Sequence, residues 1–108
     1  MANTFKLKTK ANVGVTTVGI YTAPAATTTV VIGITLANTS GTGINVGIGV
    51  TRASADDISL MKNVPIPQGS TIEFMQGNKI VLETTDTITA KSDVASSLDV
   101  ALTIMEIT

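Results

Sequence analysis

The chain has 108 residues, a formal net charge of -1, and neither histidine nor cysteine. A chain of this length fits one hydrophobic core, so we expect a single domain over residues 1–108. The near-neutral charge argues against nucleic-acid binding. The two missing residue types remove the commonest general base, thiolate nucleophile and zinc ligands, which argues against an enzyme, a metal site or a bound cofactor.

Alternation of apolar and polar residues, typical of β-strands, begins near the N-terminus. A first strand is predicted around Phe5 and Leu7, and Phe5 is assigned to the core. A second strand is predicted from Val13 to Tyr21. The segment from Ala23 to Ala26 interrupts it, because the proline in this segment cannot donate to a strand ladder.

The clearest strand follows, and its apolar residues are assigned to one face: Val30, Ile32, Ile34 and Leu36. A turn-forming cluster from Asn38 to Gly43 leads into a second apolar run on alternate residues. We expect the two strands to pair as an antiparallel hairpin. Gly47 and Gly49 fall on the polar face of the second strand, where they allow either close approach of a partner or packing inside the fold.

Shorter strands and turns complete the chain. Ile58 to Val64 is predicted as a strand, ended by a rigid crossing from Pro65 to Gly69 whose two prolines fix the backbone. A loop is predicted from Ala53 to Asp57 and a turn from Gln76 to Asn78. The remaining predicted strands are Ser70 to Met75, with Phe74 assigned to the core, Lys79 to Glu83, Thr87 to Ala90, and Leu98 to Ile107.

Eight or nine short strands at roughly ten-residue spacing, with almost no helical periodicity, predict an all-β fold. We expect an antiparallel two-sheet sandwich, with a closed barrel as the other arrangement of such strands. Strand spacing does not distinguish a jelly roll from a related Greek key.

The acidic residues form no recognisable catalytic or calcium-binding pattern. Most of them are assigned to loops or to polar faces of strands, where they remain solvated. Tyr21 is the one aromatic side chain assigned to the surface, so an aromatic platform for carbohydrate is not expected.

Two surfaces are candidates for binding a partner. Lys6, Lys8 and Lys10 share one face of the first strand, where they either block edge-to-edge aggregation or dock on an acidic partner. Met105 and Ile107 add apolar groups opposite the inward face of the last strand. Their burial in a subunit contact predicts a homo-oligomer, although coverage by the N-terminal strand explains the pattern equally well.

Hydrophobic residues make up 44% of the chain and charged residues 14%, which predicts a charge-poor surface suited to packing against neighbours. An ordinary threonine-rich β protein that acts alone is the alternative. The longest apolar stretch, Val30 to Ala37, is far shorter than the ~20 residues that cross a bilayer. Met1 to Lys6 contain no apolar signal segment, so neither a membrane partner nor export is expected.

Four segments that together span nearly the whole chain are distinctive: residues 1–14, 21–41, 65–88 and 96–108. The most specific parts are Tyr-Thr-x-Pro-Ala-x-Thr-Thr-Thr from Tyr21, and the ending Leu-x-Val-x-Leu-x-Ile-x-Glu-Ile from Leu98. The chain resembles a family of small virion proteins of tailed bacteriophages, particularly the contractile-tailed phages of marine cyanobacteria. None of these motifs is catalytic.

The resemblance implies a structural protein of the virion, assembled in the cytoplasm of the host bacterium. The leading expectation is a capsid decoration protein that binds the assembled shell as an oligomer, with the major capsid protein or other virion proteins as partners. A tail, neck or fibre accessory protein is the alternative. A host-surface binding module is a more distant one.

Overall fold

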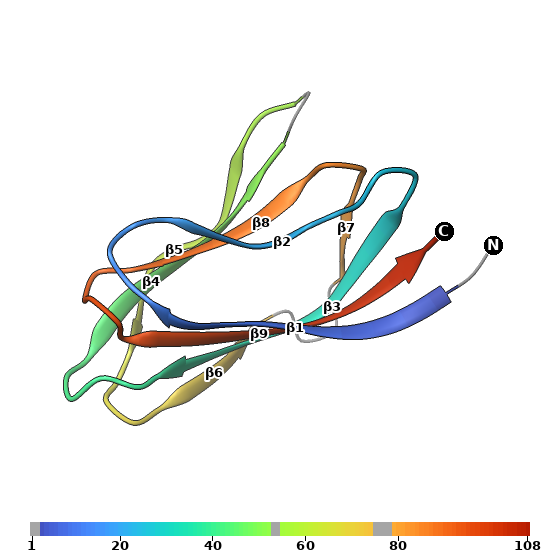
Figure 1. Ribbon diagram of the computed structural model, residues 1–108. Helices are drawn as coiled ribbons and strands as arrows, with labels where there is room; N and C mark the ends of the chain where they lie inside the picture. Colours follow the sequence, from blue (N-terminus) through green and yellow to red (C-terminus); the bar gives the residue numbers. More distant parts are fainter. Residues whose placement is uncertain (1–2, 53–54, 75–78) are drawn as a thin grey trace.

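The computed structural model describes residues 3–52, 55–74 and 79–108, and all regular elements in these ranges are β-strands. They form two antiparallel sheets that lie face to face (Figure 1), which confirms the predicted two-sheet sandwich. In this part of the chain no helix is long and apolar enough to cross a membrane. The nine strands are β1 (Asn3–Val13), β2 (Val18–Thr22), β3 (Thr28–Asn38), β4 (Ile44–Thr51), β5 (Ile58–Ile66), β6 (Thr71–Phe74), β7 (Ile80–Leu82), β8 (Thr87–Ser92) and β9 (Leu98–Ile107).

The strand order identifies the sandwich as a jelly roll. Sheet A has the order β1-β9-β3-β6, with β7 also paired to β3, and sheet B has the order β2-β8-β4-β5. Because β6 and β7 pair with successive parts of β3, they occupy one strand position. The eight positions then follow the two interleaved Greek keys of a jelly roll.

The core lies between the sheets and is built from the inward residues of alternating strands. β9 shows this most clearly, because deeply and less deeply buried residues alternate along its whole length. Its bounds and its inward face agree with the prediction. The largest fully buried side chains include Ile34, Leu36, Leu98, Leu102 and Ile104 from sheet A, and Val46, Ile66 and Ile88 from sheet B.

β3 and β4 do not form the predicted hairpin. β3 lies in sheet A and β4 in sheet B, so residues 39–43 cross between the sheets. Both strands bury apolar residues, and in opposite sheets these residues face each other across the core. Asn38 organises the crossing, because its buried amide donates to the carbonyls of Thr42 at 2.8 Å and Ile66 at 2.9 Å.

A β-bulge changes the direction of side chains within β3. Its register with β9 shifts between Val31 and Gly33. Val31 and Ile34 are fully buried, whereas Val30 and Ile32 are only half-buried. The single apolar face predicted for the whole strand is therefore wrong in its first half, since one extra residue reverses the phase of the alternation.

Several strand boundaries differ from the prediction, most clearly those of β1, β2 and β5. β1 continues to Val13, and β2 begins only at Val18. β5 runs past Val64 to Ile66, and Pro65 lies opposite Asn45 in the ladder. Proline is tolerated there because β5 is an edge strand, so the missing N–H is not needed by a further strand.

Some predictions lie outside the described residues. These are the turn from Gln76 to Asn78, the side chain of Phe74, and the first part of the loop at Ala53 and Ser54.

Candidate interaction site

A row of apolar residues crosses the outer face of sheet A. Phe5 lies opposite Met105, Met105 opposite Val30, and Val30 opposite Val81, so the row spans β1, β9, β3 and β7. Phe5 is 69% exposed and Val81 is 56% exposed, with half-buried Met105 and Val30 between them. Opposed side chains on one face of a sheet are about 5 Å apart, so the four make a continuous strip.

The strip widens along the strands. Leu7, which is 65% exposed, is the next outward residue after Phe5 on β1, and Ile107 is the next after Met105 on β9. None of these residues is charged, as is typical of the centre of an interface. We call the set the apolar face: Phe5, Leu7, Val30, Val81, Met105 and Ile107.

Small side chains line the other half of the same outer surface. Thr9, Ala101 and Thr35 lie opposite one another on β1, β9 and β3. With Ala11 and Ala37, and with Lys10, Asp99 and Val100, they surround a shallow hollow of about 240 Å³. Bulky and small side chains therefore occupy opposite halves of one sheet surface.

Met105 and Ile107, the predicted contact residues of the last strand, both belong to the apolar face. β1 pairs edge to edge with β9 and does not lie over it, so the N-terminal strand does not cover these two side chains. Phe5 also lies on this outer surface, and its assignment to the core is wrong. The inward positions of β1 are taken by lysines instead.

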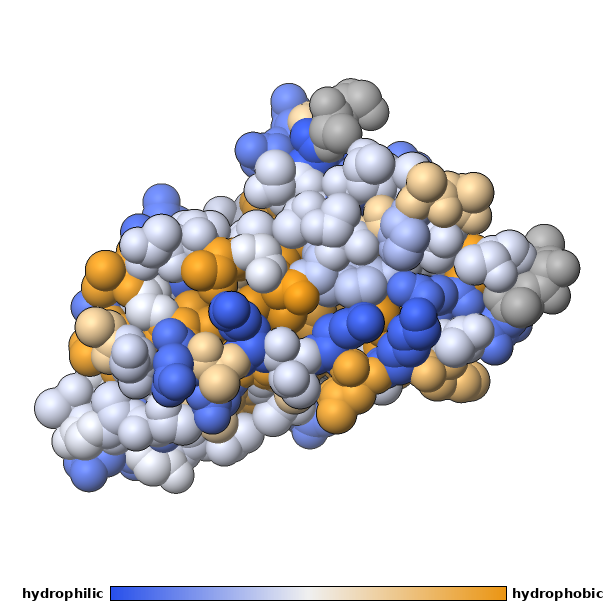
Figure 2. Space-filling view, in the orientation of Figure 1, coloured by the Kyte–Doolittle hydropathy of each residue, from blue (hydrophilic) through white to orange (hydrophobic). Residues whose placement is uncertain are grey.

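The three predicted lysines do share a face of β1, but it is the inward one. Lys6 and Lys8 lie opposite the buried residues Ile104 and Leu102 of β9, and Lys10 follows on the same side. Because β1 is an edge strand, these long side chains reach the open side of the sandwich. Figure 2 shows hydrophilic groups along β1 on this side, with hydrophobic surface between them and the strands of sheet B.

Two of the lysines make contacts within the molecule. Lys6 Nζ lies 2.8 Å from Glu106 Oε1, and Lys8 Nζ lies 6.0 Å from the centre of the Tyr21 ring. Docking of the lysines on an acidic partner remains a prediction. Since Lys6 is bound to a buried carboxylate, Lys10 is the better position to test it.

Tyr21 and Glu106 form a buried polar cluster that the sequence did not lead us to expect. The Tyr21 hydroxyl donates to Glu106 Oε2 at 2.5 Å and lies 2.8 Å from the Thr29 hydroxyl. The exposed ring predicted at Tyr21 is therefore wrong: the residue is 8% exposed, because it fills space between the sheets beside β9. The sequence contained one indication that Glu106 is buried, because the inward-facing alternation of β9 continues from Ile104 to Glu106.

The cluster changes the ionisation of both groups. The hydrogen bond from the Lys6 ammonium, then that from Tyr21, lowers the pKa of Glu106 against the opposing effect of burial. Burial first, and then the neighbouring Glu106, raises the pKa of Tyr21 to about 12. Both effects favour a carboxylate held by neutral and cationic donors, which is a structural arrangement rather than a catalytic one.

A second carboxylate is also buried. Asp86 is 4% exposed and lies 3.2 Å from Arg52 Nε, while a terminal nitrogen of the same guanidinium lies 2.7 Å from Glu83. The expectation that the acids remain solvated is therefore wrong for Glu106 and Asp86. Within the described ranges, no group of three or more acidic, histidine or cysteine side chains could hold a metal ion.

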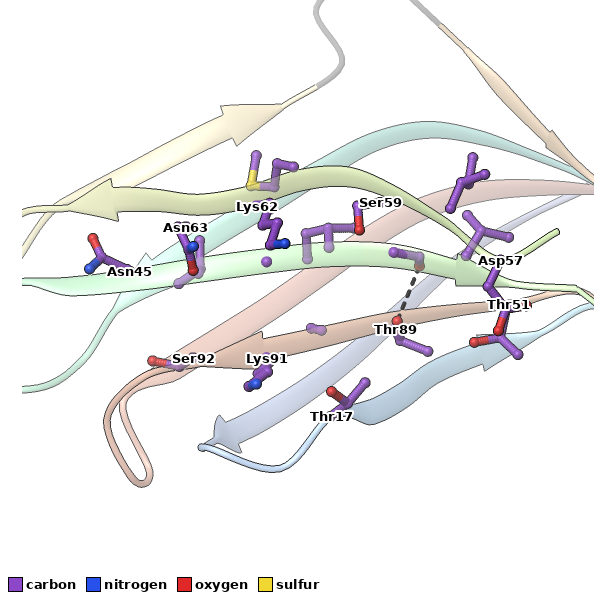
Figure 3. Close-up of a pocket in the computed structure, with 18 of the residues that line it drawn as sticks. Thr17, Asn45, Thr51, Asp57, Ser59, Lys62, Asn63, Thr89, Lys91 and Ser92 are labelled. Atoms are coloured by element: carbon purple, nitrogen blue, oxygen red, sulfur yellow. Dashed lines mark hydrogen bonds between the residues drawn. The ribbon is translucent and has the colours of Figure 1, made fainter.

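The outer face of sheet B carries a groove of about 380 Å³, whose labelled polar side chains come mainly from β4, β5 and β8 (Figure 3). Gly47 and Gly49 lie on this face. A Cβ at Gly49 would approach the carbonyl oxygen of Ile58 to 2.9 Å, and one at Gly47 would approach that of Met61 to 3.4 Å. The close approach that these glycines allow is thus made by β5 of the same chain.

Solved structures share this fold. One, from disulfide-linked pili formed by Bacillus endospore appendages, has a TM-score of 0.60 and 16% identity over 99% of this chain and 87% of that chain. Another, from the T13 IBDV viral particle, has a TM-score of 0.56 and 10% identity over 96% of this chain and 30% of that chain. At such identities the similarity establishes the fold alone.

No protein-family model matches the sequence, and no curated protein matches it significantly. These two structural neighbours come from a pilus and a viral particle. They share the fold of this chain, and the resemblance to virion proteins of tailed bacteriophages remains a prediction.

Proposed function

We propose that the protein is a structural component of a virus particle, most specifically a capsid decoration protein that binds the assembled shell as an oligomer. The apolar face carries this proposal. An exposed apolar strip of this extent is typical of a surface that a partner covers in the working assembly.

The interior of the molecule supports the same role. Among the described residues, every buried side-chain nitrogen and oxygen has a hydrogen-bond partner. The buried carboxylates Glu106 and Asp86 are paired with Lys6 and Arg52 of the same chain, whose side chains are 41% and 32% exposed. Polar groups are thus engaged in holding the fold, while apolar groups are left on the outside.

Decoration would act by mass action. A protein that binds the assembled lattice, and not its separate subunits, adds its binding free energy to the stability of the lattice. No chemical step is required of the decoration protein. This fits a chain in which the buried carboxylates Glu106 and Asp86 make structural contacts.

A tail, neck or fibre component is the second candidate. The pilus similarity favours it, because that match covers most of both chains, whereas the viral match covers a smaller part of the other chain. A host-surface binding module is less well supported, since the crossing at residues 39–43 is short and is held by Asn38.

Copy number per particle distinguishes these roles. Quantitative mass spectrometry of purified virions compares this protein with the major capsid protein. A near-stoichiometric ratio is expected for decoration, and a ratio set by the symmetry of one ring would instead indicate a neck, tail or fibre. Absence from the virions would overturn the structural role.

A further inference from the structure

We propose that the apolar face is the interface of a two-fold dimer, in which sheet A of one copy stacks on sheet A of a second copy. The inference rests on the proposed structural role and deepens it by naming the oligomer that would bind the shell.

The two halves of the sheet surface are complementary to each other. The bulky row of Phe5, Met105 and Val30 lies on one side of residue 103, and the small row of Thr9, Ala101 and Thr35 lies at the same distance on the other. A two-fold interface must match its own surface after rotation. Rotation about an axis in the interface, perpendicular to the strands and passing over Thr103, places the bulky row of each copy on the hollow of its partner.

The centre of this arrangement is open. Gly33 lies opposite Thr103 on the axis, and a Cβ at Gly33 would meet nothing within 4 Å. Leu7 lies opposite Thr103 on the other side and is 65% exposed. The two Leu7 side chains can therefore pack beside a flat centre at which the two sheets approach closely.

The acidic residues of sheet A favour this two-fold axis over the other axis in the plane of the interface, which runs parallel to the strands. Asp99 and Glu73 lie on the outer side of sheet A, in the rows of the small half. An axis parallel to the strands would bring the acidic ends of both copies together and stack bulky residues on bulky residues. An axis across the strands moves the acidic ends to opposite ends of the dimer. Asp99 then lies at the level of Ile107 in the second copy and Glu73 at the level of Val81, at the margins of the stacked sheets.

The available area suffices for a stable contact. β1 and β3 have eleven residues each, β9 has ten, and β6 and β7 have four and three, and each residue covers about 3.4 Å along its strand and about 4.8 Å across it. The projected face is then roughly 650 Å² per copy, or about 1,300 Å² for the pair. This lies within the range of about 1,200–2,000 Å² buried by specific protein interfaces.

Light scattering after gel filtration tests the dimer directly. We expect the native chain to have twice the mass of one copy, and Phe5→Lys to have the mass of a monomer with an unchanged circular dichroism spectrum. Val15→Lys is the matched control, because Val15 is 56% exposed but lies in the loop between β1 and β2. A monomeric native chain, or a Phe5→Lys variant as dimeric as the control, would overturn the proposal.

Cross-linking of introduced cysteines tests how the two copies of sheet A are oriented, with smaller changes to the side chains. The chain has no native cysteine, so each introduced thiol is unique. With a short bismaleimide we expect Thr103→Cys to cross-link readily, and Thr51→Cys, on the outer face of sheet B, to cross-link poorly. An equimolar mixture of Met105→Cys and Ala101→Cys should cross-link more than either variant alone. Equal yields from Thr103→Cys and Thr51→Cys would contradict the stacking.

The dimer and the particle role can fail separately. A monomeric chain that is nevertheless found in virions would overturn the dimer and leave the structural role intact. A dimer that is absent from virions would overturn the structural role and leave the dimer intact.

Discussion

The Tyr21 hydroxyl donates to Glu106 at 2.5 Å, although 85 positions separate the two residues in the chain. The other oxygen of the same carboxylate binds Lys6 of β1 at 2.8 Å. One buried cluster therefore joins both sheets where β1 begins and β9 ends. Because Lys6 points inward to reach Glu106, its neighbour Phe5 points outward. The polar cluster thus decides which side chains form the apolar face.

The titration of Tyr21 tests this cluster. Tyr21 is the only tyrosine in a chain without tryptophan, so absorbance near 295 nm reports one group. We expect a midpoint near pH 12 in the folded protein and near the ordinary value of 10.0 in denaturant. Since the folded pKa is raised, the associated stabilisation is present below pH 10 and is lost as the pH rises towards 12. Equal midpoints in the two states would contradict burial of the phenol.

Acid should weaken the fold through Glu106. Its folded pKa lies below the ordinary value of 4.5, so the stabilisation is present above that pH and is lost as the pH falls through the folded value. We expect the free energy of unfolding, measured with urea, to fall less steeply below about pH 5 in Glu106→Gln than in the native chain.

Asp56→Asn is the control for this comparison, because Asp56 is an exposed carboxylate in the segment before β5. It should retain the pH dependence of the native chain. If Glu106→Gln also retained it, the carboxylate would not be coupled to folding.

Substitution of Phe5 should cost the fold little. Phe5→Ser is expected to change the free energy of unfolding of the monomer by under about 1 kcal/mol, as for other exposed positions. Leu102→Ala, at a side chain that is 0% exposed, should cost about 2–5 kcal/mol. Denaturant unfolding at the lowest practical protein concentration measures both. Similar costs for the two variants would place Phe5 in the core.

Two glycines provide a matched pair on opposite sheets. Gly49→Ala should destabilise the protein by about 1–3 kcal/mol, because the new Cβ would lie 2.9 Å from the Ile58 carbonyl. In the monomer, Gly33→Ala should be neutral or stabilise by up to about 1 kcal/mol, since its Cβ meets nothing within 4 Å of its own chain. Thermal unfolding of the two variants at the lowest practical protein concentration checks the difference. The reverse order would contradict the close approach of β5.

The strands were predictable from the sequence where alternation is regular and one face is deeply buried. β9 meets both conditions, and its bounds and inward residues from Leu98 to Ile104 agree with the prediction. The phase of β3 was not predictable, because a bulge near Ile32 leaves no clear mark in composition. Nor was the separation of β3 from β4, since the choice between pairing and stacking depends on strands far away in the chain.

The apolar face was predicted only in part. The sequence placed Met105 and Ile107 on the outer side of β9 because they break the expected polarity of that side, and their contact with a partner remains a prediction. Phe5 was misassigned because alternating lysines and apolar residues on an edge strand fit either orientation. The choice between the two orientations of β1 depends on Glu106, which lies about a hundred positions away in the chain. Such a contact leaves no local pattern in the sequence around Phe5.

Co-sedimentation with assembled shells is the direct test of the proposed decoration role. Purified protein is mixed with shells that lack it, and with the unassembled major capsid protein at the same concentration. A decoration protein should bind saturably to the shells at a fixed ratio and should not bind the separate subunits. Absence of shell binding, or equal binding to both forms, would contradict a decoration role.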